Sequence, residues 1–318
     1  MSEQLIDVVI SKREDQADAV AVFELLAKDG SNLPAFDAGS HIDVHVTPDI
    51  VRQYSLSNDP GNNTVYRLGI LNDPASRGGS VAIHKNFYAG AEIQISAPRN
   101  HFPLDLSAER TILVGGGIGI TPMLTMAYTL RAAGKAFELH YCCRTRSSAG
   151  FLDELAAEFG DCVKLHFDDA GDDQRFDPQG VFAPAAADTH IYVCGPSGFM
   201  DWVIATAEGI GYDKHNIHFE YFNADIDTSG TAFEVVAEQS GISVMVGENQ
   251  TIVEALEAAG IKVDVSCEQG VCGTCLCDVL EGTPDHKDKF LNEEEREDND
   301  QIILCCSRSK SSKLVLDI

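Results

Sequence analysis

Cysteine is concentrated in residues 267–275, which read Cys267-Glu268-Gln269-Gly270-Val271-Cys272-Gly273-Thr274-Cys275. The spacing is C-x4-C-x2-C, and a further cysteine, Cys305, stands later in the chain. A tight loop of this kind presents three thiolates to one small inorganic centre. Gly270 and Gly273 allow the backbone to approach that centre closely and to donate amide N–H groups to it.

Two kinds of centre use four cysteines. Structural zinc sites favour paired short spacings at both ends, such as C-x2-C with C-x2-C. Here three ligands share one loop and the fourth stands alone, which is the plant-type 2Fe–2S spacing. We therefore predict a 2Fe–2S cluster held by Cys267, Cys272, Cys275 and Cys305, with zinc as the alternative. Cys277 is excluded because it faces the opposite side of a strand, and Cys306 because it adjoins Cys305.

The chain has 318 residues and a formal net charge of −27, so two or three domains are expected and nucleic acid is a poor partner. No apolar run is long enough for a transmembrane helix, and the first four residues do not resemble a signal peptide. These features predict a cytoplasmic protein without membrane contact, whose ten cysteines are not disulfides. The acidic balance fits steering of a basic protein partner, or equally solubility or adaptation to salt.

The pattern of apolar and polar residues changes twice along the chain. Residues 1–106 contain short alternating runs such as residues 41–46 and 91–96, which predict an antiparallel β-barrel. Residues 107–224 alternate apolar strands with helices, which predicts a parallel α/β sheet. A polar linker is expected over residues 225–232, followed by an α+β domain of the β-grasp type over residues 233–318.

Two glycine turns each follow a predicted strand and open a helix. The first is residues 115–123, Gly-Gly-Gly-Ile-Gly-Ile-Thr-Pro-Met, and the second is residues 193–200, Val-Cys-Gly-Pro-Ser-Gly-Phe-Met. Glycine lets the backbone approach a pyrophosphate, and a helix N-terminus favours its charge. Pro122 suits the first helical turn and Thr121 could cap it. The pair of turns resembles the nicotinamide domain of the ferredoxin-NADP reductase superfamily. The resemblance implies that Gly116, Gly117, Gly119, Thr121 and Pro122 contact the pyrophosphate, and that Cys194, Gly195 and Pro196 lie beside the nicotinamide.

A third group of residues lies in the barrel segment. Residues 52–58 read Arg-Gln-Tyr-Ser-Leu-Ser-Asn, where Arg52 could grip a phosphate, Tyr54 offers an aromatic face and Ser55 a hydroxyl. Gly78-Gly79-Ser80, preceded by Arg77, begins a helix-like run and forms a second phosphate cradle. Two phosphate contacts on one domain favour FMN.

These motifs resemble the ferredoxin-NADP reductase superfamily, and over essentially the whole chain the phthalate dioxygenase reductase and vanillate demethylase reductase family. The resemblance implies the order flavin, nicotinamide and ferredoxin domain, with FMN. It also implies that Cys194 lies beside the nicotinamide and flavin, with Ser55 at the flavin's redox edge and Phe222 near the flavin. NADH is favoured by the resemblance, although Arg144 and Arg146 could accept the 2′-phosphate of NADPH or be surface charges.

The three motifs explain one another, because a flavin can take a hydride and release electrons singly to a cluster. The resemblance implies a monomeric reductase component that serves a Rieske-type terminal oxygenase acting on an aromatic acid, a methoxylated aromatic or a quaternary amine. The acidic residues 293–300 form part of its expected docking face. The alternatives are a stand-alone reductase of ferric iron, quinones or another electron carrier, and a zinc-binding module without enzymatic activity.

Overall fold

The computed structural model describes residues 5–47, 49–223 and 227–318. Two segments on which predictions were made lie outside the described residues. They are residues 1–4, which do not resemble a signal peptide, and residues 224–226, at the predicted domain boundary and linker. The chain divides into two compact units, Met1–Phe222 and Asn223–Ile318. Among the described helices, none is both long and apolar enough to cross a membrane.

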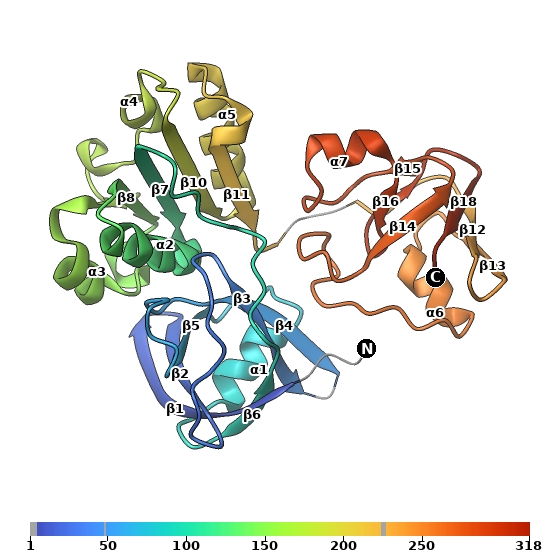
Figure 1. Ribbon diagram of the computed structural model, residues 1–318, viewed down its shortest axis with the longest axis horizontal. Helices are drawn as coiled ribbons and strands as arrows, with labels where there is room; N and C mark the ends of the chain where they lie inside the picture. The colour runs from blue at the N-terminus through green and yellow to red at the C-terminus, as the bar shows by residue number, and fades with distance from the viewer. Residues whose placement is uncertain (1–4, 48, 224–226) are drawn as a thin grey trace. The chain divides into compact units, whose positions relative to one another are not determined.

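The first part of unit one is an antiparallel six-stranded sheet in the order β4-β3-β6-β1-β2-β5 (Figure 1). An isolated bridge between Leu56 and Leu68 brings its two edges together, so the sheet closes into the predicted barrel. The helix α1 (Gly79–Asn86) follows β5. The strands are β1 (Ile6–Ala17), β2 (Val20–Ala27), β3 (His41–Thr47), β4 (Ile50–Ser55), β5 (Tyr66–Leu71) and β6 (Glu92–Ile95).

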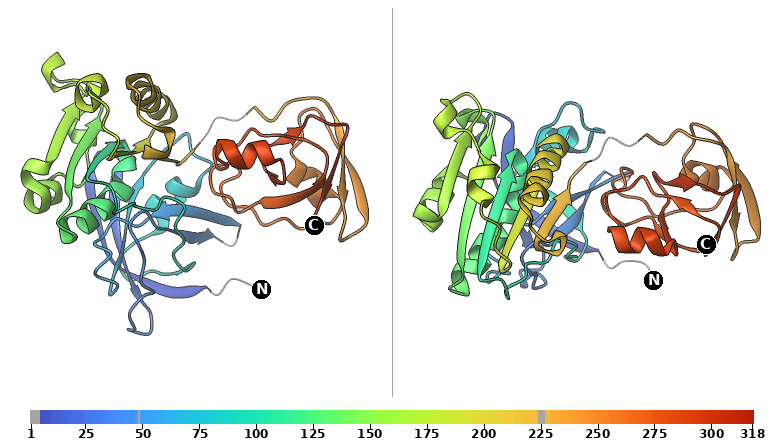
Figure 2. Two further views of the ribbon diagram at one scale, coloured as in Figure 1. Left: turned by 45° about the horizontal axis from the view of Figure 1, so that its top comes forward. Right: turned by 90° about the horizontal axis from the view of Figure 1, so that it is seen from above.

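The second part of unit one is a five-stranded parallel sheet in the order β11-β10-β7-β8-β9. Helices α2 and α3 lie on one face and α4 and α5 on the other (Figures 1 and 2). The strands are β7 (Arg110–Gly116), β8 (Ala136–Cys143), β9 (Val163–Phe167), β10 (Thr189–Gly195) and β11 (Ile217–Tyr221). The helices are α2 (Ile120–Ala132), α3 (Leu152–Phe159), α4 (Pro178–Phe182) and α5 (Ser197–Ile210).

Polar contacts join the barrel to the parallel sheet. Glu154 of α3 accepts hydrogen bonds from Arg67 of β5, at 2.6 Å, and from the hydroxyl of Tyr128 in α2. The Arg67 guanidinium lies 5.5 Å from the centre of the Phe151 ring. Only 18% of the Arg67 side chain and 15% of the Glu154 side chain are exposed. The two parts of unit one are therefore attached by a half-buried ion pair with ordered partners.

Unit two has a mixed sheet in the order β13-β12-β18-β14-β16, in which β12 and β18 run parallel. Helix α6 packs on this sheet, while α7 lies at the other end of the unit (Figure 1). The elements are β12 (Phe233–Ala237), β13 (Ile242–Val246), α6 (Ile252–Ala258), β14 (Leu276–Glu281), β15 (Pro284–Asp285), α7 (Glu293–Asp298), β16 (Gln301–Ile303), β17 (Arg308–Ser309) and β18 (Lys313–Leu316). The predicted barrel, parallel sheet and α+β unit are confirmed.

Arg308 is a buried cation in unit two, with 3% of the residue exposed. Its guanidinium donates to five backbone carbonyl groups, and its Cζ lies 5.2 Å from the centre of the Phe233 ring. The acceptors are Thr228, Gly230, Thr231, Gly247 and Gln250. Three of them precede β12, so Arg308 attaches this part of the predicted linker to unit two.

Candidate functional site

The cysteine loop before β14 brings together the four thiols predicted as cluster ligands. The Cys267 thiol is in hydrogen-bonding contact with those of Cys272 and Cys305, and the Cys275 thiol with that of Cys305. Backbone N–H groups of Gln269 and Val271 donate to Cys267 Sγ at 3.4 Å. No group of three or more His, Cys, Asp or Glu among the described residues is arranged to hold a single metal ion.

Gly273 allows the loop to turn between two of these cysteines. Its φ is 72°, a conformation that costs a residue with a side chain roughly 1–2 kcal/mol. A Cβ atom at this position would lie 2.3 Å from Cζ of Phe290, so the aromatic ring covers the turn directly. Gly270 also has a positive φ, 65°. Both predicted glycines therefore serve a backbone requirement.

The two cysteines that were excluded are buried in the core of unit two. Cys277 is in β14, and its thiol donates to the carbonyl oxygen of its neighbour Asp278 at 3.6 Å. The Cys306 thiol contacts the Cys305 thiol and lies 3.8 Å from the Ile303 carbonyl oxygen. Cys306 thus lies beside the predicted ligand set, while its own hydrogen bonding points back into the core.

The two glycine turns of unit one meet where the strand order of the parallel sheet reverses. The chain runs outward from β7 to β8 and β9, then returns to place β10 on the other side of β7. A Cβ atom on Gly119 would lie 2.2 Å from the carbonyl oxygen of Cys194. Ligands of open α/β sheets bind at the carboxyl ends of the strands, at this kind of crossing.

Aromatic packing keeps the two turns together. Phe199 lies over both, because its Cδ1 would be 2.8 Å from a Cβ atom on Gly116 and 3.0 Å from one on Gly195. The predicted cap at Thr121 is wrong. A 3₁₀ turn over Gly117–Gly119 precedes α2, so Thr121 is already the second helical residue and its hydroxyl donates to the Ile118 carbonyl at 3.0 Å.

The remaining predicted nicotinamide residues differ in position. Pro122 is buried in the first turn of α2, and Pro196 directly precedes α5. Arg144 follows the end of β8 and is exposed. The guanidinium of Arg146 lies 5.8 Å from the centre of the Phe167 ring. The structure therefore places Arg144 at the carboxyl edge of the sheet, on a different strand from the two glycine turns.

The predicted phosphate cradle of the flavin lies at the start of α1. Gly78 precedes the helix with a φ of 84°, and Arg52 Nη2 donates to the Arg77 carbonyl oxygen at 3.2 Å. A Cβ atom on Gly79 would be 2.6 Å from Cγ of Arg52, so the two motifs are packed together. The Ser80 hydroxyl is 3.0 Å from that of Ser76, so it also orders the preceding loop.

Ser55 belongs to a buried polar cluster formed by strands of the barrel and of the parallel sheet. Its hydroxyl hydrogen-bonds the Glu220 carboxylate, and Glu220 pairs with Cys194 across β10 and β11. Burial raises the pKa of Glu220 to about 8, although the Ser55 hydrogen bond opposes this. Burial, with the Glu220 charge nearby, raises the pKa of the Cys194 thiol well above its ordinary value.

His41 completes this cluster. Its backbone pairs with Ser55 between β3 and β4, and its Nδ1 lies 4.0 Å from Glu220 Oε1. Only 5% of the side chain is exposed, and neither ring nitrogen has a partner among the described residues. Burial lowers the pKa of His41 to about 4, assisted by the neighbouring His101 and Arg99. The ring is therefore neutral near pH 7.

The sequence motifs indicate neither His41 nor Glu220 as a site residue. The available signal was a carboxylate inside an aromatic strand end, Phe219-Glu220-Tyr221-Phe222. Phe222, chosen there instead, is half-buried and packs against the core of the parallel sheet. Tyr54 lies in β4 next to Ser55, and burial raises the pKa of its hydroxyl.

Known proteins match the chain over nearly its full length. Residues 235–310 match the model of the 2Fe–2S iron–sulfur cluster binding domain. The chain is 46% identical over 317 residues to the vanillate O-demethylase oxidoreductase of Pseudomonas sp. (strain HR199 / DSM 7063), covering 99% of this chain and 100% of that one. It is 39% identical to the tetrachlorobenzoquinone reductase of Sphingobium chlorophenolicum, covering 98% of each.

Among solved structures, that of phthalate dioxygenase reductase has a TM-score of 0.75 and 37% identity, over 99% of this chain and 98% of that one. The chain belongs to the family of the vanillate O-demethylase oxidoreductases. Members are NAD(P)H-dependent iron–sulfur flavoproteins, and the cofactors are FMN, a 2Fe–2S cluster and NADH.

The residues of this family member fit those cofactors. The four thiols and the amide donors of the cysteine loop suit a 2Fe–2S cluster. In the barrel, Gln53 lies between Arg52 and Tyr54, and its Nε2 is buried without a partner among the described residues. This unsatisfied donor, together with the Gly78–Gly79 turn, fits a bound flavin and its phosphate.

Proposed function

We propose that this chain is the reductase component of a two-protein oxygenase system, which takes hydride from NADH and delivers single electrons to a separate Rieske-type terminal oxygenase. The observation that supports it most directly is the presence, in one chain, of glycine turns that meet at Cys194 and of the four-cysteine loop. When bound, the cofactors supply hydride donation, conversion of an electron pair to single electrons, and one-electron output.

We assign separate tasks to the residues. Arg52 and the Arg77–Ser80 turn hold the flavin phosphate, and Tyr54 lies against the flavin. Gly116, Gly117, Gly119, Thr121, Pro122, Gly195 and Pro196 hold the nicotinamide coenzyme, with Arg144 near its adenosine end. Ser55, Cys194 and Phe222 surround the position where the two rings meet. Cys267, Cys272, Cys275 and Cys305 ligate the cluster.

Glu220 adds a proton-holding group to this assignment. A carboxyl with a pKa of about 8 is mostly protonated at neutral pH, and its hydrogen bond to Ser55 orients that hydroxyl. The neutral carboxyl places no fixed negative charge beside Cys194. We infer that Glu220 keeps the hydride-transfer region uncharged until electrons arrive there.

The partner and its substrate are assigned by relationship. The vanillate O-demethylase oxidoreductase is the model for an oxygenase acting on a methoxylated aromatic acid. We also propose that the chain is a monomer, with a flavin domain over residues 1–106, a nicotinamide domain over residues 107–224, a linker over residues 225–232 and a ferredoxin domain over residues 233–318. We further propose a cytoplasmic location, which the free thiols of all ten cysteines support.

The tetrachlorobenzoquinone reductase supports a second candidate, a reductase that gives electrons to small quinones. The two functions differ in their need for the cluster. Anaerobic titration with NADH, followed by visible spectroscopy, should bleach both flavin and cluster in the wild-type chain. Cys272→Ser should abolish electron delivery to a Rieske oxygenase and retain flavin reduction, whereas Cys277→Ser should retain both.

The outcomes separate the candidates. Full quinone reduction by Cys272→Ser, together with no delivery to any Rieske oxygenase by the wild type, would favour the second function. If Cys272→Ser loses both quinone reduction and electron delivery to the oxygenase, while Cys277→Ser keeps both, then quinones also receive their electrons through the cluster.

A further inference from the structure

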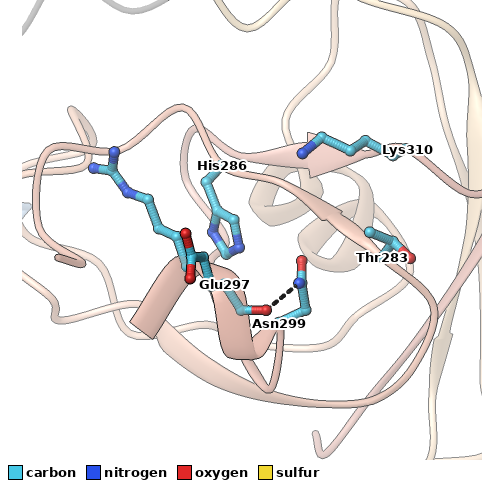
Figure 3. A pocket seen from close by; sticks show the side chains of 6 residues that line it. Thr283, His286, Glu297, Asn299 and Lys310 are labelled. Carbon is cyan, nitrogen blue, oxygen red and sulfur yellow. Dashed lines mark hydrogen bonds between the residues drawn. The ribbon is translucent and has the colours of Figure 1, made fainter. Parts of the chain in front are cut away.

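A pocket of about 430 Å³ lies in unit two, between the end of α7 and the β15–β17 ribbon (Figure 3). Its lining residues are Thr283, His286, Arg296, Glu297, Asn299 and Lys310. Figure 3 shows His286 reaching from the ribbon side toward α7, with Lys310 and Thr283 on the segments next to the same ribbon. None of these residues is among the predicted cluster ligands, and the proposed electron path does not use them.

His286 is the observation that marks this pocket as more than a surface hollow. Its side chain is 5% exposed, and neither ring nitrogen makes a hydrogen bond of good geometry in the described residues, although the Arg296 backbone lies close enough to interact with the ring. The nearest carboxylate oxygen, Asp288 Oδ1, lies 3.8 Å from Nδ1, beyond hydrogen-bonding distance. Buried polar groups are normally paired, so two unpaired nitrogens in one ring indicate a missing partner.

Asp288 cannot easily become that partner, because its oxygens are already occupied. Its Oδ2 accepts from the backbone N–H groups of Phe290 and Leu291, at 3.1 and 2.8 Å. Its Oδ1 accepts from the Ser307 hydroxyl at 3.3 Å. The carboxylate therefore orders the backbone behind the pocket, and the imidazole of His286 keeps unused hydrogen-bonding capacity.

Two further groups in the pocket have donors to spare. Arg296 Nη2 donates to the Asp288 carbonyl at 2.7 Å and lies 3.7 Å from Asp288 Oδ2, but its Nε is buried with no partner in the described structure. Lys310 is exposed and has no ion pair within the described part of the chain. Asn299 Nδ2 is already used by the Glu297 carbonyl, at 2.7 Å.

The lining of the pocket is less acidic than the surface around it. Arg296 and Lys310 are cations in the lining and Glu297 is its one carboxylate, while the buried Asp288 carboxylate behind it lies 3.7 Å from Arg296 Nη2. The chain as a whole carries −27, and the neighbouring helix α7 exposes Glu293, Glu294 and Glu295. Basic donors grouped within an acidic surface are suited to an oxyanion, because guanidinium and ammonium groups pair with carboxylate and phosphate.

We infer that the pocket between α7 and the β15–β17 ribbon is a binding site for a small oxyanion, held by Arg296, Lys310 and His286. A phosphate or a small carboxylic acid has the required acceptors, and the volume accommodates either. Such a ligand would satisfy the His286 ring and Arg296 Nε together. It would also fix the C-terminal end of α7 next to residues that we expect to face the acceptor protein.

Calorimetric titration of the holoenzyme tests this site, with inorganic phosphate in one arm and benzoate in the other at fixed ionic strength. Lys310→Gln removes an exposed cation and should leave the fold unchanged, which the visible spectrum of the cluster will verify. Lys313→Gln is the matched control, because Lys313 pairs with Glu281 at 3.0 Å and does not line the pocket. His286→Asn is the second variant.

We expect one saturable site per chain for at least one of the two anions, weakened tenfold or more in Lys310→Gln and in His286→Asn. Lys313→Gln should bind as tightly as the wild type. Binding of phosphate alone would identify an inorganic ligand, and binding of benzoate alone an organic acid. The inference is overturned if neither anion binds saturably, or if Lys313→Gln weakens binding as much as Lys310→Gln does.

Discussion

Gly119 packs against the backbone of Cys194 so closely that a Cβ atom on Gly119 would come within 2.2 Å of the Cys194 carbonyl oxygen. Gly119 has a φ of −63°, which any residue can adopt, so the contact and not the backbone angle requires glycine here. Glu220 of β11 pairs with Cys194 of β10 at the same end of the sheet. The spacing between the two glycine turns is therefore set by direct contact of their backbones.

Gly119→Ala should force the two turns apart. We expect a loss of about 1–3 kcal/mol in the free energy of unfolding, and a weaker affinity for NADH, because the methyl group meets backbone that cannot move aside cheaply. Chemical denaturation and NADH titration of flavin reduction measure these effects. Gly209→Ala is the control, since a Cβ atom there has no neighbour within 4 Å and it lies inside α5. It should be neutral or stabilising by about 1 kcal/mol.

The raised pKa of Glu220 predicts how the free energy of unfolding depends on pH. Its pKa is raised from 4.5 to about 8, so the folded chain holds one proton more than the unfolded chain between those values. The contribution of Glu220 to stability is therefore complete at low pH and is lost as the pH rises through about 8. Glu220→Gln should remove this dependence, as seen in denaturation midpoints at several pH values from 5 to 9.

Glu92→Gln is a suitable control for that experiment, because Glu92 forms a surface ion pair with Lys28 in the barrel of the same unit. It should keep the wild-type dependence on pH. An identical pH profile for wild type and Glu220→Gln would contradict the assignment of a protonated Glu220.

The neighbouring cysteines of unit two provide a matched comparison. Cys305→Ser should lose the visible absorption and the iron of the cluster, because it removes a thiolate ligand. Cys306→Ser should retain both, since its thiol faces the Ile303 carbonyl. Reduction of the flavin by NADH should continue in either variant. Retention of a full cluster in Cys305→Ser would show that Cys306 is the fourth ligand.

The ion pair of Arg67 with Glu154 should contribute to the stability of unit one. Removing one member of a buried pair costs about 3–5 kcal/mol, and this pair is partly exposed, so we expect about 3 kcal/mol for Glu154→Ala. Replacing both residues, as in Arg67→Met with Glu154→Leu, should restore most of that loss. A double-mutant cycle of Glu154→Ala with Tyr128→Phe would measure how much of the stability comes from the hydrogen bond of the Tyr128 hydroxyl to Glu154.

The exposed face of α7 allows a test of docking to the oxygenase. Asn292 and Glu295 form a reciprocal capping box at the start of this helix, so changing Glu295 would also disturb the fold. Glu293→Gln with Glu294→Gln removes two negative charges and leaves the cap unchanged. Electron delivery should slow at low salt and depend less on ionic strength. Unchanged kinetics across salt would place the docking face elsewhere.

The cysteine loop could be predicted from sequence because its ligands are local: three of the four cysteines lie within residues 267–275 and need one turn to meet. The glycine turns were equally readable, since each joins one strand to the next helix. The start of α2 was predicted less well. A 3₁₀ turn over Gly117–Gly119 shifts the helix start, so that Thr121 cannot serve as its cap.

The cluster of His41, Ser55 and Glu220 could not be predicted in the same way. His41 and Ser55 come from paired strands of the barrel, whereas Glu220 comes from the parallel sheet, so the packing of one sheet against the other brings them together. Glu220 looks like a polar residue on a half-buried strand, and nothing local indicates that its carboxyl is buried. Only the three-dimensional packing of the two sheets shows that it reaches Ser55.

Arg308 has a practical meaning for anyone who wishes to cut or recombine this protein. A fragment that started at β12 would lack the carbonyl groups of Thr228, Gly230 and Thr231, and would leave a buried guanidinium short of three acceptors. A transplantable ferredoxin module must therefore begin at Thr228 or earlier. Chimaeras should therefore be joined ahead of β12, at Thr228 or earlier.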